Sequence, residues 1–155
     1  MQQKVLYQID LLEITRKNML DATADFSPEQ LNLIPPGFSN NLAWQLGHVL
    51  VTQQLLQYGL SNNTPHITND LIQKYRKGTR PDGSIEATEI QYIREQLTRT
   101  TTLLRQDFEA GIFTDYKTYS TSYNATLHNI EEAITFNNLH EAMHLGYIMS
   151  IRKFV

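Results

Sequence analysis

The chain has 155 residues and a formal net charge of −3 at pH 7, and 19% of its residues are charged. This length predicts a single domain over residues 1–155, with a core large enough that no metal or disulfide is needed merely to fold. The balanced charge gives no indication of a nucleic-acid partner. Cysteine is absent, which excludes a disulfide framework, a cysteine nucleophile and a cysteine-based zinc site. Any thiol chemistry would therefore use a thiol supplied by a cosubstrate.

The sequence has no apolar segment of the kind needed for export or membrane insertion. Asp10, Glu13 and Arg16 stand where a signal peptide needs an unbroken apolar run. No stretch approaches the ~18 apolar residues of a membrane span. We therefore expect a cytoplasmic protein with no membrane partner.

Hydrophobic spacing predicts a long helix over residues 3–24 and a second one that ends near Gly59. Between them, Ser27 is a candidate helix cap and Pro28 suits a first helical position. The polar run "SNN" then offers acceptors for the start of the second long helix. The apolar face of the first helix is formed by Val5, Ile9, Leu12 and Met19, and that of the second by Trp44, Val51 and Leu55 together with His48.

A polar segment over residues 61–84 separates the second long helix from the third. It is too long for a tight turn, so we expect a crossover or a lid, with one short helix around "NDLIQKYRK". The third long helix is predicted over residues 86–108. Its apolar positions are Ile90, Ile93, Leu97, Leu103 and Leu104.

Residues 111–128 are rich in Thr, Ser and Tyr, and we expect irregular structure there without a strand ladder. Asn129 and Glu132 have the spacing of a capping box, so a fourth long helix is expected over residues 130–153. Four long helices predict an all-α fold, a four-helix bundle with a long crossover between its second and third helices.

The stretch "HEAMHLG", residues 140–146, has the His-Glu-x-x-His spacing of a zinc-binding helix. On a helix, His140 and His144 project from the same side and can reach one ion. Two neutral imidazoles on a core-facing surface need partners, and a metal would satisfy both. A coincidental pair, one hydrogen-bonded in the core and one exposed, is the alternative. In the helical pattern, His140 and His144 lie on an apolar stripe with Ala133, Phe136, Met143, Tyr147 and Ile151.

A catalytic zinc usually takes three protein ligands, and in proteases of this pattern the third follows the motif. No Glu, Asp or His follows His144 in this sequence, and position 150 is Ser150, which disfavours a zinc peptidase. His48 is the best upstream candidate because it lies on the apolar face of the second long helix, although a hydrogen-bonded core histidine is the alternative. His66 and His128 are expected to have surface or capping roles.

Four further charged residues allow two interpretations each. Glu141 could approach a metal-bound water or a ligand imidazole, although a solvated or interfacial carboxylate is the simpler interpretation. Arg76, Lys77 and Arg80 could meet an anionic cosubstrate if the crossover folds over the site. A solvated loop face is the simpler interpretation for these three.

The chain resembles the DinB family of four-helix metalloenzymes. The residues that carry the resemblance are "NNLAWQLGH", which ends in His48, and "NLHEAMHLGYI", which contains His140 and His144. The likeness extends over nearly the whole chain, including "FSPEQLNLIPPGF". It implies an up-down-down-up bundle, often a homodimer, with a divalent metal held by the three histidines in an open cavity. Characterised members are transferases or isomerases that use bacillithiol, mycothiol or glutathione.

The leading hypothesis is therefore a metal-dependent transferase that acts on a small-molecule substrate and activates an external low-molecular-weight thiol. Three imidazoles suit zinc or nickel, with iron or copper as further alternatives. A hydrolase that uses metal-bound water is the first alternative. A non-catalytic helical binding module, in which the histidines are structural, is the second. Sequence assigns no catalytic or substrate-binding residue beyond the candidate metal ligands.

Overall fold

The computed structural model describes residues 2–155, and most of them are helical. The elements in chain order are α1 (Gln2–Ala22), α2 (Pro28–Asn32), α3 (Leu42–Gln57), the 3₁₀ turn η1 (Gly59–Ser61), α4 (Asn69–Tyr75), α5 (Ala87–Glu109), β1 (Tyr119–Ser120), β2 (Thr126–Leu127) and α6 (Ile130–Ile151). The all-α prediction is confirmed in its main feature. The expectation that residues 111–128 contain no strand pairing was wrong, because β1 and β2 form a short antiparallel hairpin.

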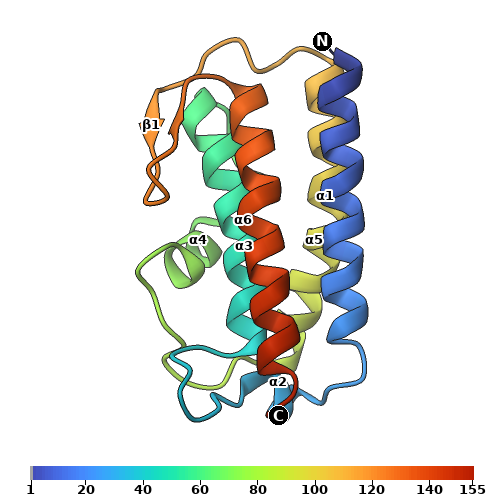
Figure 1. Ribbon diagram of the computed structural model, residues 1–155, viewed down its shortest axis with the longest axis vertical. Coiled ribbons are helices and arrows are strands. Elements are labelled where there is room, and N and C mark those ends of the chain that lie inside the picture. The colour runs from blue at the N-terminus through green and yellow to red at the C-terminus, as the bar shows by residue number, and fades with distance from the viewer. Residues whose placement is uncertain (1) are drawn as a thin grey trace.

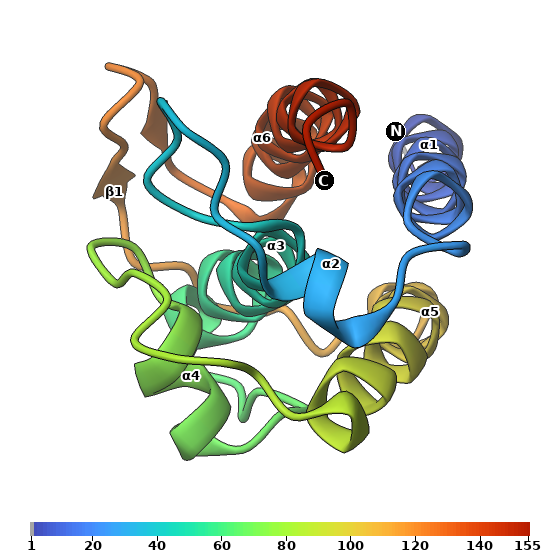
Figure 2. The same ribbon diagram turned by 90° about the horizontal axis from the view of Figure 1, so that it is seen from below.

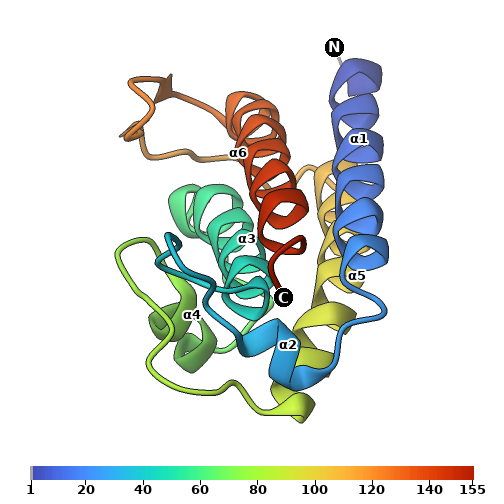
Figure 3. The ribbon, with the colours of Figure 1, turned by 60° about the horizontal axis from the view of Figure 1, so that its bottom comes forward.

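The four long helices α1, α3, α5 and α6 lie side by side (Figure 1). In this view α1 and α6 run downward along the chain, whereas α3 and α5 run upward. Helix α1 packs against α5 and α6, and α3 packs against the same two helices. The crossover with α4 and the β1–β2 hairpin lie beside α3, on the side away from α1 (Figures 2 and 3). The second and fourth long helices are therefore neighbours, which brings His48 within reach of the α6 histidines.

Side-chain hydrogen bonds to backbone N–H groups mark the starts of α2 and α3. Ser27 and Gln30 cap α2 reciprocally, each side chain accepting a hydrogen bond from the other residue's backbone N–H, with Pro28 in the first turn. The Asn41 side chain accepts from the Trp44 backbone N–H at 2.8 Å and starts α3. The predicted caps at these two helices are confirmed.

The start of α6 differs in one detail from the predicted capping box. The Asn129 side chain does accept a hydrogen bond from the Glu132 N–H, at 2.9 Å. The Glu132 carboxylate, however, accepts from the backbone N–H of His128 at 2.8 Å rather than from that of Asn129. The reciprocal half of the box is thus displaced by one residue.

The apolar faces predicted for α1 and α5 pack into the core. All four predicted apolar positions of α1 are buried, as are Ile90, Ile93, Leu97 and Leu104 of α5. Across residues 2–155, no helix combines the length and apolar character needed to cross a membrane.

The interior also holds a buried ion pair between Arg16 of α1 and Glu141 of α6, which are 1% and 0% exposed. The Arg16 Nη2 and Nε atoms donate to the carboxylate at 2.7 and 3.0 Å. Arg16 Nη1 donates to the Leu97 carbonyl and the Thr100 hydroxyl of α5 at 3.0 and 2.8 Å. Asn137 Nδ2 donates to the same carboxylate at 2.9 Å. One polar network therefore joins α1, α5 and α6.

Both interpretations of Glu141 are wrong, because it neither approaches the metal ligands nor meets solvent. Successive helix positions differ by ~100°, so Glu141 turns away from His140 and toward Arg16. Its carboxylate is held by Arg16 and Asn137. The partner lies 125 residues away in the chain, and local sequence gives no signal for it.

Removing one member of this pair should destabilise the protein strongly. Arg16→Met leaves the Glu141 charge buried without its partner and should lower the free energy of unfolding in urea by about 3–5 kcal/mol. The double variant Arg16→Met/Glu141→Leu should regain most of that loss, because neither charge remains. Lys17→Met is the matched control, since the Lys17–Asp21 pair is exposed, and its effect should stay within about 0.5 kcal/mol. Equal effects of Arg16→Met and Lys17→Met would contradict this account.

Candidate metal centre

His48 lies in the middle of α3, and its ring is fixed on two sides. Its Nδ1 atom lies 2.8 Å from the backbone carbonyl of Tyr75. A carbonyl only accepts hydrogen bonds, so Nδ1 carries the proton and Nε2 presents a lone pair. The Trp44 ring stacks on the imidazole, with centroids 4.6 Å apart and planes within 11°. Both contacts hold the Nε2 lone pair in one direction.

His144 has its tautomer set in the same way by a side chain of α3. Its Nδ1 donates to Gln45 Oε1 at 2.5 Å. The Gln45 amide is oriented by its own Nε2, which donates to Asn40 Oδ1 at 2.7 Å. The Nε2 atom of His144 is therefore also left with a free lone pair.

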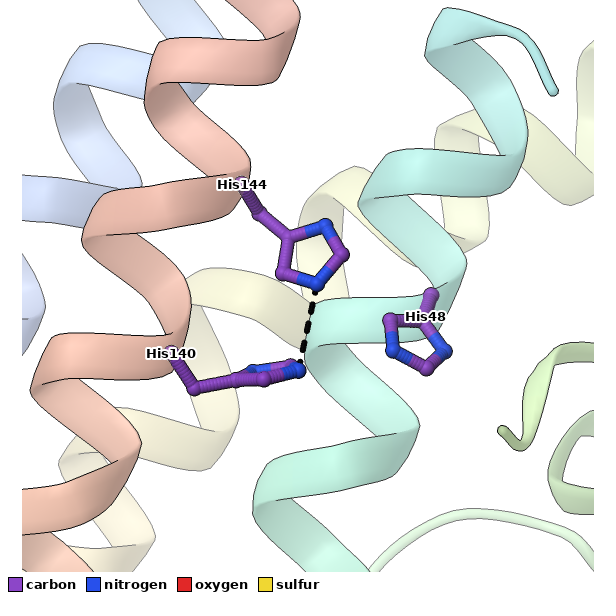
Figure 4. Close-up of side chains that lie close together, drawn as sticks. All are labelled: His48, His140 and His144. Atoms are coloured by element: carbon purple, nitrogen blue, oxygen red, sulfur yellow. Dashed lines mark hydrogen bonds between the residues drawn. The ribbon is translucent and has the colours of Figure 1, made fainter. Parts of the chain in front are cut away.

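His140 completes the group, and its Nε2 lies 3.1 Å from Nε2 of His144 (Figure 4). Its Nδ1 is buried and has no hydrogen-bond partner among the described residues. With the proton on Nδ1, two lone pairs face each other across 3.1 Å. With the proton on Nε2, the Nδ1 lone pair is buried unsatisfied, which is unfavourable. A cation bound to both Nε2 atoms would replace the lone-pair contact with two favourable bonds.

The donor set fits a divalent transition metal. The three histidines offer ligand nitrogens that all lie within 4.8 Å of one another. Metal–imidazole bonds of about 2.0–2.1 Å in a tetrahedral site imply nitrogens about 3.3 Å apart, close to the separation of His140 and His144. Three neutral nitrogens leave one position open for a further ligand. The structure thus brings together the three histidines singled out in the sequence.

Burial keeps these imidazoles uncharged. Desolvation lowers the pKa of His140 to about 4, with a further contribution from His48. Desolvation also lowers the pKa of His144 to about 3, with repulsion from His140 and His48 adding to it. The pKa of His48 is lowered by burial in spite of its hydrogen bond to Tyr75. All three are therefore neutral near pH 7, which is the form that binds metals.

The histidines line a cavity of about 530 Å³. Its walls come from α3, α6, the crossover and the β1–β2 hairpin. The Thr52 hydroxyl, one turn beyond His48, lies in this wall 3.4 Å from His48 Nε2. The volume is within the range of small-molecule sites, so a ligand in the cavity can contact the three histidines directly.

The remaining histidines lie outside this group, as the sequence predicted. His66 Nε2 pairs with Asp107 at 2.9 Å, and His128 Nδ1 pairs with Glu132 at 3.0 Å. The predicted core stripe of α6 is only partly buried, since Met143 and Tyr147 are 47% and 52% exposed. The physical reason is that α6 contacts other long helices on only part of its circumference, and Met143 borders the cavity instead.

The residues that orient the metal-site histidines were not predicted from the sequence. Gln45 lies three positions before His48, a spacing that places both on one side of α3, and this was the available signal. Tyr75 acts through its backbone carbonyl, which no residue pattern reveals. Thr52 has the i+4 spacing from His48 but no motif of its own.

A largely helical protein with a candidate three-histidine metal centre is the class that this fold and site define. The chain belongs to the DinB superfamily, whose family model matches residues 11–148. No curated protein was found to match the chain.

Two helical glycines provide a matched test of how His48 is positioned. A Cβ atom at Gly47 would clash with the buried Tyr75 ring, whereas one at Gly146 would have no neighbour within 4 Å. Gly47→Ala should lower the free energy of unfolding by about 1–3 kcal/mol and weaken zinc binding, because Tyr75 must shift and its carbonyl orients His48. Gly146→Ala should be neutral or stabilising by up to about 1 kcal/mol. Urea unfolding and zinc titration of both variants test this, and similar behaviour of the two would contradict it.

The lowered pKa values predict that metal binding displaces few protons from the ligands. Histidines with an ordinary pKa near 6.5 would release about two protons from three ligands at pH 6. The folded-state pKa values of His140 and His144 lie below that pH, so release from all three ligands should be less than one proton. Zinc titration calorimetry at pH 6 in two buffers of different ionisation enthalpy measures this number. Release of two protons would show that the imidazoles are charged before the metal binds.

Proposed function

We propose that the protein is a metal-dependent enzyme of the DinB type, a single four-helix bundle domain over residues 1–155. His48, His140 and His144 hold a divalent transition metal in it, zinc or nickel in the first place, with iron or copper as alternatives. The observation that supports this most is the convergence of three neutral imidazoles on one cavity. Membership of the DinB superfamily supports the same proposal.

The proposed reaction joins the sulfur of an external low-molecular-weight thiol to an electrophilic carbon of a small molecule. The S–H bond and the bond to the substrate's leaving group break, and the proton departs with that group. A bound cation supplies charge that favours the thiolate form of a thiol at the open position. The chain's own residues orient the site: Tyr75 holds His48, and Gln45 holds His144. The absence of cysteine from the chain means that the thiol must come from a cosubstrate.

The hydrolase alternative has weaker support, because hydrolysis by metal-bound water is usually assisted by a general base. Among the described residues, no Asp or Glu lines the cavity. Glu141, the nearest carboxylate in the sequence motif, is bound to Arg16 on another side of α6.

The resemblance to the DinB family also implies a homodimer. Leu139, Met143 and Tyr147 are exposed at four-residue spacings along α6, and this apolar strip supports that part of the proposal.

The proposal is tested by metal analysis and activity assays on untagged protein. Wild type should bind about one metal ion per chain and should consume a model electrophile only when bacillithiol, mycothiol or glutathione is present. His140→Ala should lose both the metal and the turnover, whereas His128→Ala should keep both, because His128 is exposed and does not line the cavity. Turnover without any thiol would favour the hydrolase. A wild-type protein that binds no metal would leave only the non-catalytic binding module.

A further inference from the structure

Lys77 is the member of the basic crossover group that reaches the cavity. It lines the cavity wall, whereas Arg76 and Arg80 do not. Of the two expectations for these cations, a solvated loop face therefore describes Arg76 and Arg80, and Lys77 is the residue placed to meet an anion.

The turn that carries Lys77 is attached to α3 on both sides. Two residues earlier, the Tyr75 carbonyl accepts the hydrogen bond from His48. Two residues later, the Thr79 hydroxyl accepts a hydrogen bond from Trp44 Nε1 at 3.2 Å. The same hydroxyl donates to the Arg76 carbonyl at 2.8 Å and closes the turn. Residues 75–79 are thus fixed next to the histidine cluster, and Lys77 projects from a constrained segment.

The charge of the cavity has one sign. Among the described residues that line it, Lys77 is the only Lys or Arg, and no Asp or Glu is present. No Asp or Glu oxygen of the described chain lies within 4.0 Å of Lys77 Nζ, in contrast to Lys74, which pairs with Glu89 at 2.9 Å. Lys77 is therefore an exposed residue of the cavity wall whose ammonium group is not neutralised by a carboxylate of the described chain.

The rest of the wall is mainly apolar. Leu55, Leu56 and Leu60 line it from α3 and the turn after it, and Phe136 and Met143 line it from α6. Burial of hydrocarbon against such a wall is favourable, at about 25 cal/mol per Å². A ligand with no hydrocarbon part would leave this apolar surface without a complementary partner.

We propose that the cavity binds an amphipathic organic acid, whose anionic group pairs with Lys77 and whose hydrocarbon part packs against the leucines, Phe136 and Met143. As the substrate class of the enzyme, this assignment rests on the proposed function. As a statement about what the cavity binds, it depends only on the cavity and Lys77. A neutral compound of the same shape binds more weakly, because it leaves the ammonium group without an anion.

The test compares octanoate with octanamide, which share a hydrocarbon chain and differ in charge. Isothermal titration of wild type, Lys77→Gln and Arg80→Gln is carried out on metal-free and on zinc-loaded protein. Arg80→Gln is the matched control, because it removes one positive charge from the same crossover without changing the cavity wall. Wild type should bind octanoate about fivefold more tightly than octanamide, as expected for a partly exposed charge pair. This preference should decrease at high salt.

Lys77→Gln should abolish the preference in metal-free protein and leave octanamide binding unchanged, whereas Arg80→Gln should keep the preference. The inference is overturned if wild type binds neither compound, if it binds both equally, or if Lys77→Gln and Arg80→Gln behave alike. Zinc titration of the same protein tests the metal centre separately. Zinc binding without a preference for octanoate contradicts only the ligand class, and the preference without zinc binding contradicts only the proposed function.

Discussion

The candidate metal centre depends on the close contact of three uncharged imidazoles between α3 and α6. Nitrogens that face one another within a few ångströms are unfavourable unless a proton or a cation lies between them, and burial disfavours the protonated form. The surrounding hydrogen bonds keep the unfavourable arrangement in place. Tyr75 and Gln45 occupy the outer nitrogens of His48 and His144, so the inner nitrogens of these two can turn only toward the shared centre.

Adjacent residues of helix α6 face two different environments. His140 and His144 face the cavity, whereas Asn137 and Glu141 face the interior formed with α1 and α5. The Arg16–Glu141 pair fixes the position of the same helical turn that carries the histidines. A buried ion pair adds little net stability over an apolar replacement, so we interpret it as a device that sets the rotation and height of α6. The metal centre depends on that setting, because a shift of α6 moves two of the three ligands together.

Different elements contribute different chemical groups to the cavity and its surroundings. The helices contribute the histidines and most of the apolar surface, while the crossover contributes Lys77 and the carbonyl that orients His48. The segment over residues 61–84, which the sequence predicts to be a polar connection, is therefore part of the site. This explains why it is attached to α3 at both Trp44 and His48 instead of extending freely into solvent.

Much of the fold could be predicted from the sequence, because the long helices have strong local signals. The apolar spacing of α1 and the caps at Ser27 and Asn41 are local, and the structure follows them. The three histidines were also recognisable, since an i,i+4 pair and an inward-facing upstream histidine need only helical periodicity. Contacts across the chain could not be predicted. Three features depend on the path of the chain in space. These are the pairing of Glu141 with Arg16, the hydrogen bond from His48 to the Tyr75 carbonyl, and the position of Lys77, but not Arg76 or Arg80, in the cavity wall. The β1–β2 hairpin was missed because two residues per strand are too few to show an alternating pattern.

The most direct test of the metal centre is anomalous X-ray diffraction at the zinc edge, using crystals of untagged protein grown with zinc. The account predicts one strong peak within about 2.0–2.1 Å of a ring nitrogen from each of His48, His140 and His144. A zinc ion bound only by the two α6 histidines, with His48 still hydrogen-bonded and out of reach, would contradict it, as would the absence of any peak in the cavity.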